Sequence, residues 1–245
     1  MQRSVVYLLG LIAGVFPVLA SAQWAVKAEA GVVAARGNSD TDTANAKLKI
    51  VRDFERWKHT LEAAGVYASD STGTIGQRWN VREQTDYQIS DKGFWFVSGR
   101  YEDDRFSGFE YQSTLGTGFG WRFFDDEVTK LSVQVGGGYK MLRRQDSLAE
   151  DGITLIPGER ERSAMAQGSV DFERQLTATT KVLNKLLVET SSDNTFVQND
   201  LSLEVKILGS LALAVGYSVR YNTDPPAEFT TTDTLTTLNL VYEIE

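Results

Sequence analysis

The sequence contains no cysteine, a single histidine, His59, and only four prolines in 245 residues. The missing cysteines exclude disulfide scaffolds, thiolate metal sites and thiol nucleophiles. One histidine leaves little material for a zinc centre or a Ser-His catalytic pair. Basic residues are also scarce: 25 Lys and Arg stand against 33 Asp and Glu. This balance argues against nucleic acid, which binds basic surfaces. We therefore expect a non-enzyme with no catalytic residue, no metal and no cofactor.

Residues 1–22 have the features of a secretory signal peptide. Arg3 supplies a positive charge, and residues 5–16 form an apolar run that is short for a membrane-spanning helix. Small residues precede a cleavage point that we place after Ala22. The alternative is an uncleaved membrane anchor. We predict an exported protein with one domain over residues 23–245.

The remaining chain has no apolar stretch of about 18 residues that could form a transmembrane helix. Instead, apolar residues alternate with other residues, as in Leu211, Leu213, Val215 and Tyr217. Alternation with a period of two predicts β-strands, and strands of about 9–11 residues match the requirement of a bilayer. Twelve such runs lie near residues 24–36, 43–52, 57–68, 78–89, 94–102, 109–123, 129–142, 162–173, 181–190, 196–207, 211–221 and 234–244.

The connections between these runs alternate in character. Residues 90–93, 124–127 and 208–210 are tight hairpin turns, whereas residues 143–161 and 222–233 are long, polar and contain proline. Short turns at one end and long loops at the other are typical of outer-membrane barrels. We predict an all-β fold: an antiparallel up-and-down transmembrane β-barrel of about 12 strands. The alternative is a soluble periplasmic ligand-binding barrel with its apolar faces inward.

Aromatic residues gather near the strand ends, as expected for the two girdles of a membrane barrel. We assign Trp57, Trp79, Phe94, Trp95, Trp121, Phe123 and Tyr242 to one end, and Tyr67, Tyr101, Phe109, Tyr111, Tyr139 and Tyr221 to the other. Between the girdles, the lipid face carries one charge, Glu83, and one amide, Asn184. Glu83 indicates either a tolerated acid on that face or a bulge in its strand.

The opposite faces of the strands carry charges of both signs. The candidate lumen-lining residues are Lys47, Lys49, Arg82, Asp86, Arg100, Glu102, Arg122, Lys140, Glu204, Lys206 and Arg220, with Glu62, Asp171, Glu189 and Asp200 on the same face. In a narrow interior such charges can pair into a plug or line a small selective pore. The glycines at 116–120, 136 and 138 also face inward, and they either widen a pore or permit curvature.

Two other patterns are weak as chemistry. Asn38, Asp40 and Asp42 have the spacing that begins a calcium loop, but the glycine and glutamate that complete it are missing, which favours a solvated hairpin. His59 starts a strand without an evident catalytic partner, although an outer-membrane lipid enzyme would depend on it. The charged segments 103–105 and 143–162 could bind the divalent cations that bridge lipopolysaccharide, or could be solvated loops.

Three parts of the chain carry a family resemblance: residues 37–42; residues 99–108 with their continuation through 116–120 and 136–139; and residues 221–226 with 233–234 and 240–242. They resemble the YdiY-like family of salt-induced outer-membrane proteins, the domain-of-unknown-function 481 group. One departure is the ending Tyr242-Glu243-Ile244-Glu245, since outer-membrane proteins usually end on an aromatic residue. The resemblance implies a membrane barrel and little about activity.

The leading function hypothesis is envelope maintenance under salt or osmotic stress, which rests on the family name. The alternative is a narrow channel for small polar or charged solutes. We expect a monomer in the outer membrane, in contact with outer-membrane lipid and lipopolysaccharide and inserted by the barrel-assembly machinery.

Overall fold

The computed structural model describes residues 24–35, 41–105, 107–148, 155–192, 194–225 and 229–244. The predicted signal peptide and residues 36–40, which include Asn38 and Asp40 of the calcium-loop pattern, lie outside the described residues. Over these ranges, the chain forms no helix with the length and apolar character needed to span a membrane.

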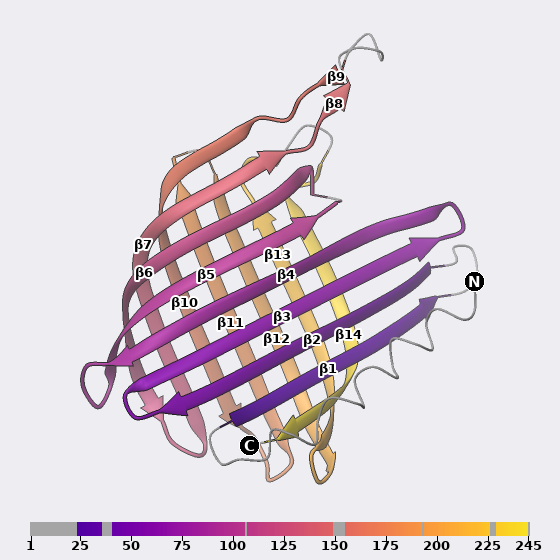
Figure 1. Cartoon of the computed structure of the whole chain (residues 1–245). Coiled ribbons are helices and arrows are strands. Elements are labelled where there is room, and N and C mark those ends of the chain that lie inside the picture. Colours follow the sequence, from indigo (N-terminus) through magenta and orange to yellow (C-terminus); the bar gives the residue numbers. More distant parts are fainter. Residues whose placement is uncertain are drawn as a thin grey trace.

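Twelve strands close into an antiparallel barrel, which confirms the predicted fold and strand number (Figure 1). The barrel strands are β1 (Trp24–Ala35), β2 (Thr41–Phe54), β3 (Trp57–Asp70), β4 (Gly73–Gln88), β5 (Gly93–Asp104), β6 (Phe109–Asp125), β7 (Thr129–Arg144), β10 (Arg160–Gln175), β11 (Thr180–Ser191), β12 (Thr195–Leu208), β13 (Leu211–Asn222) and β14 (Thr232–Ile244). Each pairs with the next along the chain, and β1 pairs with β14 to close the ring.

The connection from β7 to β10 differs from its prediction. It carries a separate two-stranded hairpin, β8 (Ser147–Leu148) and β9 (Leu155–Ile156), which projects beyond the barrel in Figure 1. We expected a long polar loop over residues 143–161, but β7 and β10 extend into both of its ends. Two-residue strands are too short to produce a readable alternation.

The alternating pattern places the apolar residues on the outside of the barrel. On β13, Leu213, Val215 and Tyr217 are exposed, whereas Ala214 between them is 2% exposed. Asn239 and Thr237 on β14 are likewise buried among exposed leucines. An apolar exterior around a polar interior is the arrangement of a membrane barrel. The soluble barrel with apolar faces inward is therefore wrong.

The two ends of the barrel differ, and we name them by their connections. At the short-turn end, β2–β3, β4–β5, β6–β7, β10–β11 and β12–β13 are joined by residues 55–56, 89–92, 126–128, 176–179 and 209–210. Gly209 there has φ of 56°, a left-handed conformation that glycine adopts at little cost. At the loop end, three connections, residues 71–72, 105–108 and 192–194, are also short, so the expectation of long loops throughout this end is wrong.

Three aromatic assignments need correction. Trp79 lies toward the loop end, with its ring 5.4 Å from that of Tyr101, because β4 runs from the loop end to the short-turn end. Phe94 and Phe109 are almost fully buried and do not reach the lipid girdles. Both point into the lumen, where Arg122 and Arg144 lie over their rings.

The inward-facing glycines of β6 and β7 hold these two strands close together. A Cβ atom on Gly118 would collide with the backbone of β7, and one on Gly136 with that of β6. Above Gly116 and Gly120 the space is occupied by Gln167 and Phe94. The glycines thus permit curvature and close packing, and the pore-widening alternative is wrong at these positions.

Candidate functional site

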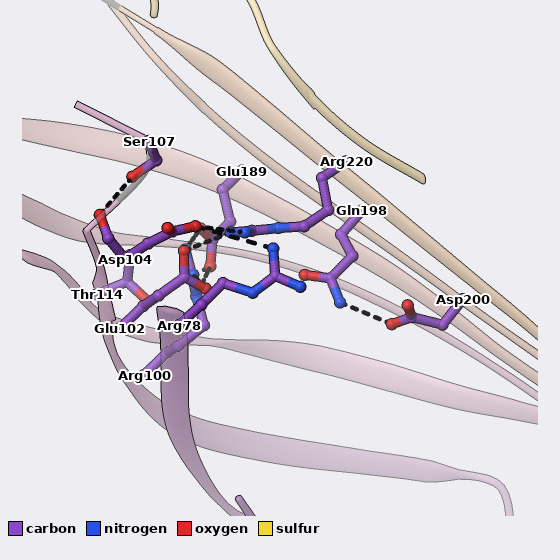
Figure 2. Close-up of polar contacts among 10 residues, drawn as sticks. All are labelled: Arg78, Arg100, Glu102, Asp104, Ser107, Thr114, Glu189, Gln198, Asp200 and Arg220. Atoms are coloured by element: carbon purple, nitrogen blue, oxygen red, sulfur yellow. Dashed lines mark hydrogen bonds and ion pairs between the residues drawn. The ribbon is translucent and has the colours of Figure 1, made fainter. Parts of the chain in front are cut away.

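Three arginines and three carboxylates fill the lumen at the loop end (Figure 2). We call these residues the ion-pair cluster; they are Arg78, Arg100, Glu102, Asp104, Glu189 and Arg220. They come from β4, β5, β11 and β13, and β5 neighbours neither β11 nor β13 in the barrel. The cluster therefore spans the lumen from wall to wall, with three charges of each sign.

The ion pairs form a continuous chain. Arg220 pairs with Glu102 and, at 3.2 Å, with Asp104. Arg100 pairs with Glu189 and, at 3.3 Å, with the other oxygen of Glu102. Arg78 joins the chain through Asp104 at 3.8 Å. Shared carboxylates of this kind fix the guanidinium groups in place and leave few bonds free for a passing solute.

An aromatic ring supports the centre of the cluster. Phe196 at the loop end of β12 is 3% exposed, and the Cζ atoms of Arg100 and Arg220 each lie 5.0 Å from its ring centroid. Thr114 on β6 donates a hydrogen bond to Glu189 at 3.3 Å. The cluster is thus buried, aromatic-backed and hydrogen-bonded, which favours a rigid closure of the lumen.

One cation near this closure lacks a direct partner. Lys140 on β7 pairs in register with Thr114 and is 2% exposed. Its Nζ atom has no hydrogen-bond partner among the described residues.

Figure 2 also shows that Gln198 donates a hydrogen bond to Asp200, at 2.7 Å, further along the lumen from the cluster.

Near the middle of strands β2, β3 and β11, the lumen is more exposed than at the ion-pair cluster. Lys47 and Lys49 on β2 are exposed, and neither lies within ion-pair distance of a carboxylate in the described part of the chain. Lys185 and Glu62 pair at 2.6 Å across the lumen, with side chains 32% and 25% exposed. We call this more exposed part of the lumen, around Lys47, Lys49, Lys185 and Glu62, the chamber.

A second charged group lies at the floor of this chamber. Glu204 pairs with Lys27 and, at 3.5 Å, with Lys181, which also contacts Glu243 at 2.9 Å. These residues come from β12, β1, β11 and β14, next to the point where the barrel closes. They brace the closing strands β1 and β14 against β12 and β11 across the lumen.

The other candidate lumen-lining residues take separate positions. Arg82 donates to Gln84 at 3.1 Å, and Gln84 donates to the buried Asp86 at 2.8 Å. Arg122 stacks on Phe94, with its Cζ atom 4.7 Å from the ring centroid. Lys206 is exposed beside a register shift of β12.

Sequence reasoning missed several members of these groups. Arg78 and Asp104 lie at or beyond the ends of the predicted strands 78–89 and 94–102. Lys27 and Lys181 occur at alternating inward positions, so the period-two pattern itself could have identified them. Phe196 also alternates in step with the inward Asp200 and Glu204, but an aromatic residue on this face runs against the expected polar interior and was therefore not selected.

Two polar groups on the outer face satisfy each other. Asn184 on β11 and Asn199 on β12 exchange amide hydrogen bonds of 3.1 and 3.2 Å. The sequence identified Asn184 but not its partner. A reciprocal amide pair meets part of the hydrogen-bonding demand of both side chains, which lipid cannot supply.

Glu83 keeps its place in a regular ladder between Leu61 and Gly99, so a bulge there is wrong. Thr85 donates its hydroxyl to Glu83 at 2.7 Å, and His59 Nδ1 lies 2.8 Å from the same hydroxyl oxygen. The single hydroxyl proton is directed to Glu83, and His59 is therefore not placed to accept it as a catalytic base would. In the described segments, no group of three or more His, Asp or Glu could hold a metal ion.

A closed barrel with an apolar exterior and a charged, ion-paired lumen has the fold of an outer-membrane β-barrel. In agreement, the structure is similar to the translocator domain of the autotransporter NalP from Neisseria meningitidis, with a TM-score of 0.55, 11% identity and coverage of 99% of this chain and 95% of that one. An outer membrane channel from Pseudomonas putida F1, COG4313, gives a TM-score of 0.49 at 9% identity, over 90% and 94% of the two chains.

The chain belongs to the family described as "Protein of unknown function, DUF481", which matches residues 28–244 and confirms the predicted family. It is 22% identical over 218 residues to "Uncharacterized protein YdiY" of Escherichia coli (strain K12), which covers 88% of this chain and 81% of that protein.

Proposed function

We propose that the chain is an outer-membrane protein with a closed lumen, which helps to keep the envelope intact under salt or osmotic stress. The ion-pair cluster carries this proposal. It joins opposite walls of the barrel, and the side chains of Arg100, Glu102, Glu189 and Arg220 are each 7% exposed or less. A barrel closed in this way can span the membrane and contact lipid without admitting solutes.

The stress role rests on the name of the family that the sequence resembles, and the matching family model is described as a protein of unknown function. A closed barrel occupies area in the membrane, and the ion-pair cluster joins its opposite walls. Outer-membrane lipid and lipopolysaccharide are the proposed contacts of the apolar exterior, the barrel-assembly machinery inserts the chain, and the working form is a monomer.

A deletion strain tests the proposal. We expect slower growth and greater leakage of a periplasmic reporter after a shift to high salt, with both restored by the full chain. Complementation with Asp126→Asn, a change in an exposed turn remote from the lumen, serves as the matched control and restores growth. Equal growth and equal leakage with and without the protein would contradict the proposal.

A narrow channel for small polar or charged solutes is the second candidate. It is favoured by the open chamber around Lys47, Lys49 and Lys185, which has the ion-pair cluster as its barrier. In planar bilayers this candidate predicts discrete current steps that change in Arg100→Ala and Arg122→Ala. Persistent absence of steps in the unaltered protein would leave the closed barrel as the sole candidate of the two.

Catalysis is not part of the proposed function. Thr85 gives its proton to Glu83 and not to His59, so the polar row on the outer face has no activated nucleophile. A hydrolytic activity on phospholipid that disappears in His59→Ala would overturn this part of the proposal.

A further inference from the structure

The closing seam between β1 and β14 is much shorter than any other in the barrel. Among the described residues, the two strands pair over five residue pairs, from Val26–Ile244 to Ala30–Leu240. Each of the other eleven ladders contains at least eleven pairs. Above Ala30, both strands continue toward the loop end without forming a ladder with each other in the described residues.

Side-chain packing replaces the ladder at Gly31. A Cβ atom there would collide with the carbonyl oxygen of Leu238 and with the side chain of Asn239, so β14 passes across the inner face of β1. Asn239 donates to Glu29 at 3.1 Å, and Asn45 donates to the carbonyl of Gly31 at 3.4 Å.

The amides at this point are incompletely satisfied. The Oδ1 atoms of Asn45 and Asn239 are buried and have no hydrogen-bond partner among the described residues. Buried acceptors without donors destabilise the closed arrangement. The seam therefore has a weak upper end, from which the pairs above Lys27–Glu243 can separate.

The two sides of the seam carry complementary surfaces. On the lumen side, Lys47 and Lys49 of β2 are exposed and lack carboxylate partners within ion-pair distance in the described segments. On the outer side, a groove of about 510 Å³ crosses β1 to β4. Small residues, Ala28, Ala46, Ala63 and Gly65, line its floor, with Trp79 at its rim.

We propose that the β1–β14 seam is a lateral opening that binds an anionic phospholipid, with the phosphate in the lumen and the acyl chains in the outer groove. Lipid is the occupant because the groove lies on the apolar exterior, within the membrane-spanning part of the strands. The anionic headgroup follows from the two unpaired lysines, and the route follows from the position of the seam between the two surfaces. In this arrangement the phosphate pairs with the lysine ammonium groups, and the acyl chains contact the alanine and glycine residues of the groove.

Opening at this seam breaks fewer backbone hydrogen bonds than opening at any other. In lipid, a strand edge without partners is unfavourable, so a barrel would open where the fewest pairs separate. The brace of Lys27 on Glu204 and of Lys181 on Glu243 holds the short-turn end of β1 and β14. Separation then proceeds downward from Ala30 and stops at this brace.

The absence of cysteine allows a direct test with an engineered disulfide. Ala30→Cys with Leu240→Cys joins the last pair of the seam, and Leu203→Cys with Val215→Cys joins a pair of the complete β12–β13 ladder as the matched control. Directly opposed residues of antiparallel strands are close enough for a disulfide. Each protein is reconstituted in phosphatidylcholine vesicles that contain phosphatidylglycerol with a diazirine beside its phosphate, and the photoadducts are mapped by mass spectrometry.

We expect adducts on lumen-facing residues near the seam, such as Lys47 and Glu29, in the unaltered protein and the oxidised control. Oxidised Ala30→Cys/Leu240→Cys should lose these adducts and regain them on reduction, which shows that the same chain is folded. Lys47→Gln with Lys49→Gln should reduce them by about five-fold for each lysine removed. Adducts confined to outward residues, or lumen adducts unchanged by the oxidised seam disulfide, would overturn the proposal. The proposed closed lumen is tested separately by conductance, because the ion-pair cluster lies apart from the seam.

Discussion

Two regions of the lumen, the ion-pair cluster and the chamber, carry similar charged side chains but differ in how deeply these side chains are buried. At the loop end, arginines and carboxylates are buried together, and Glu102 is 2% exposed. Near the middle of β11 and β3, Lys185 and Glu62 form an ion pair with side chains 32% and 25% exposed. The comparison teaches that alternating inward charges do not by themselves make a pore or a plug. Burial decides whether an ion pair closes the lumen or merely lines it.

Glu102→Gln should have the largest effect. The amide keeps the shape of the side chain but leaves Arg100 and Arg220 short of a counter-charge in a buried site, which costs about 3–5 kcal/mol. Urea titration of the folded, heat-modifiable band in vesicles measures the loss, and planar bilayers should show new current steps. A loss below about 1 kcal/mol without such steps would mean that the cluster does not close the barrel.

Phe196→Leu should cause the next largest loss in the free energy of unfolding. The ring lies beneath both guanidinium groups, and desolvated cation–π contacts contribute about 2 kcal/mol. Leucine preserves an apolar side chain, so the loss reports the aromatic face. The same urea titration checks it, with Phe196→Tyr as the control that retains a ring. If leucine and tyrosine destabilise the barrel equally, the ring has no special role.

Glu62→Gln makes the same chemical change as Glu102→Gln, but in the more exposed chamber. Its ion pair with Lys185 is partly hydrated, so the expected loss is below about 1 kcal/mol. Conductance should stay as in the unaltered protein, because the barrier lies elsewhere. If Glu62→Gln lowered the free energy of unfolding as much as Glu102→Gln does, the distinction between the ion-pair cluster and the chamber would be wrong.

Asp126→Asn should have the smallest effect, and it depends on pH. The backbone N–H groups of Thr129 and Val128 donate to Asp126 in the β6–β7 turn and hold its pKa below the ordinary value of 3.8. The charged form therefore stabilises the turn above that value, and the contribution is lost as the pH falls through the lowered pKa. Unfolding titrations at pH 7 and at low pH should differ less for Asp126→Asn than for the unaltered protein. An unchanged difference would mean that the carboxylate does not cap this turn.

The barrel could be predicted from the sequence because its strands report their two faces directly. In β13, exposed Leu213 and Val215 alternate with buried or small residues, and this alternation fixes which face meets lipid. Tight turns such as the one at Gly209 then set the neighbours of each strand. The paired hairpin β8–β9 gave no comparable signal, since two residues cannot show a period.

The partners inside the lumen could not be predicted in the same way. Arg220 and Glu102 are 118 residues apart in the chain, and they meet only because of the stagger and tilt of all the strands between them. The pattern identifies inward residues but carries no information on which opposing wall each reaches. Phe94 was misplaced although it alternates in step with the inward Arg100 and Glu102 on β5. Phe109 was misplaced because a register shift between Phe109 and Tyr111 turns it to the inner face, and the sequence pattern does not show such a shift.

The cations of the ion-pair cluster are all arginines. A guanidinium group stays charged at any pH that a cell meets, whereas an ammonium group can lose its proton when buried. Burial also protects the pairs from screening by dissolved ions. The ion pairs at the loop end should therefore persist at high as at low salt concentration, and at alkaline as at neutral pH. Under the proposed function, the barrel would keep the same resistance to solutes as the salinity of the medium changes.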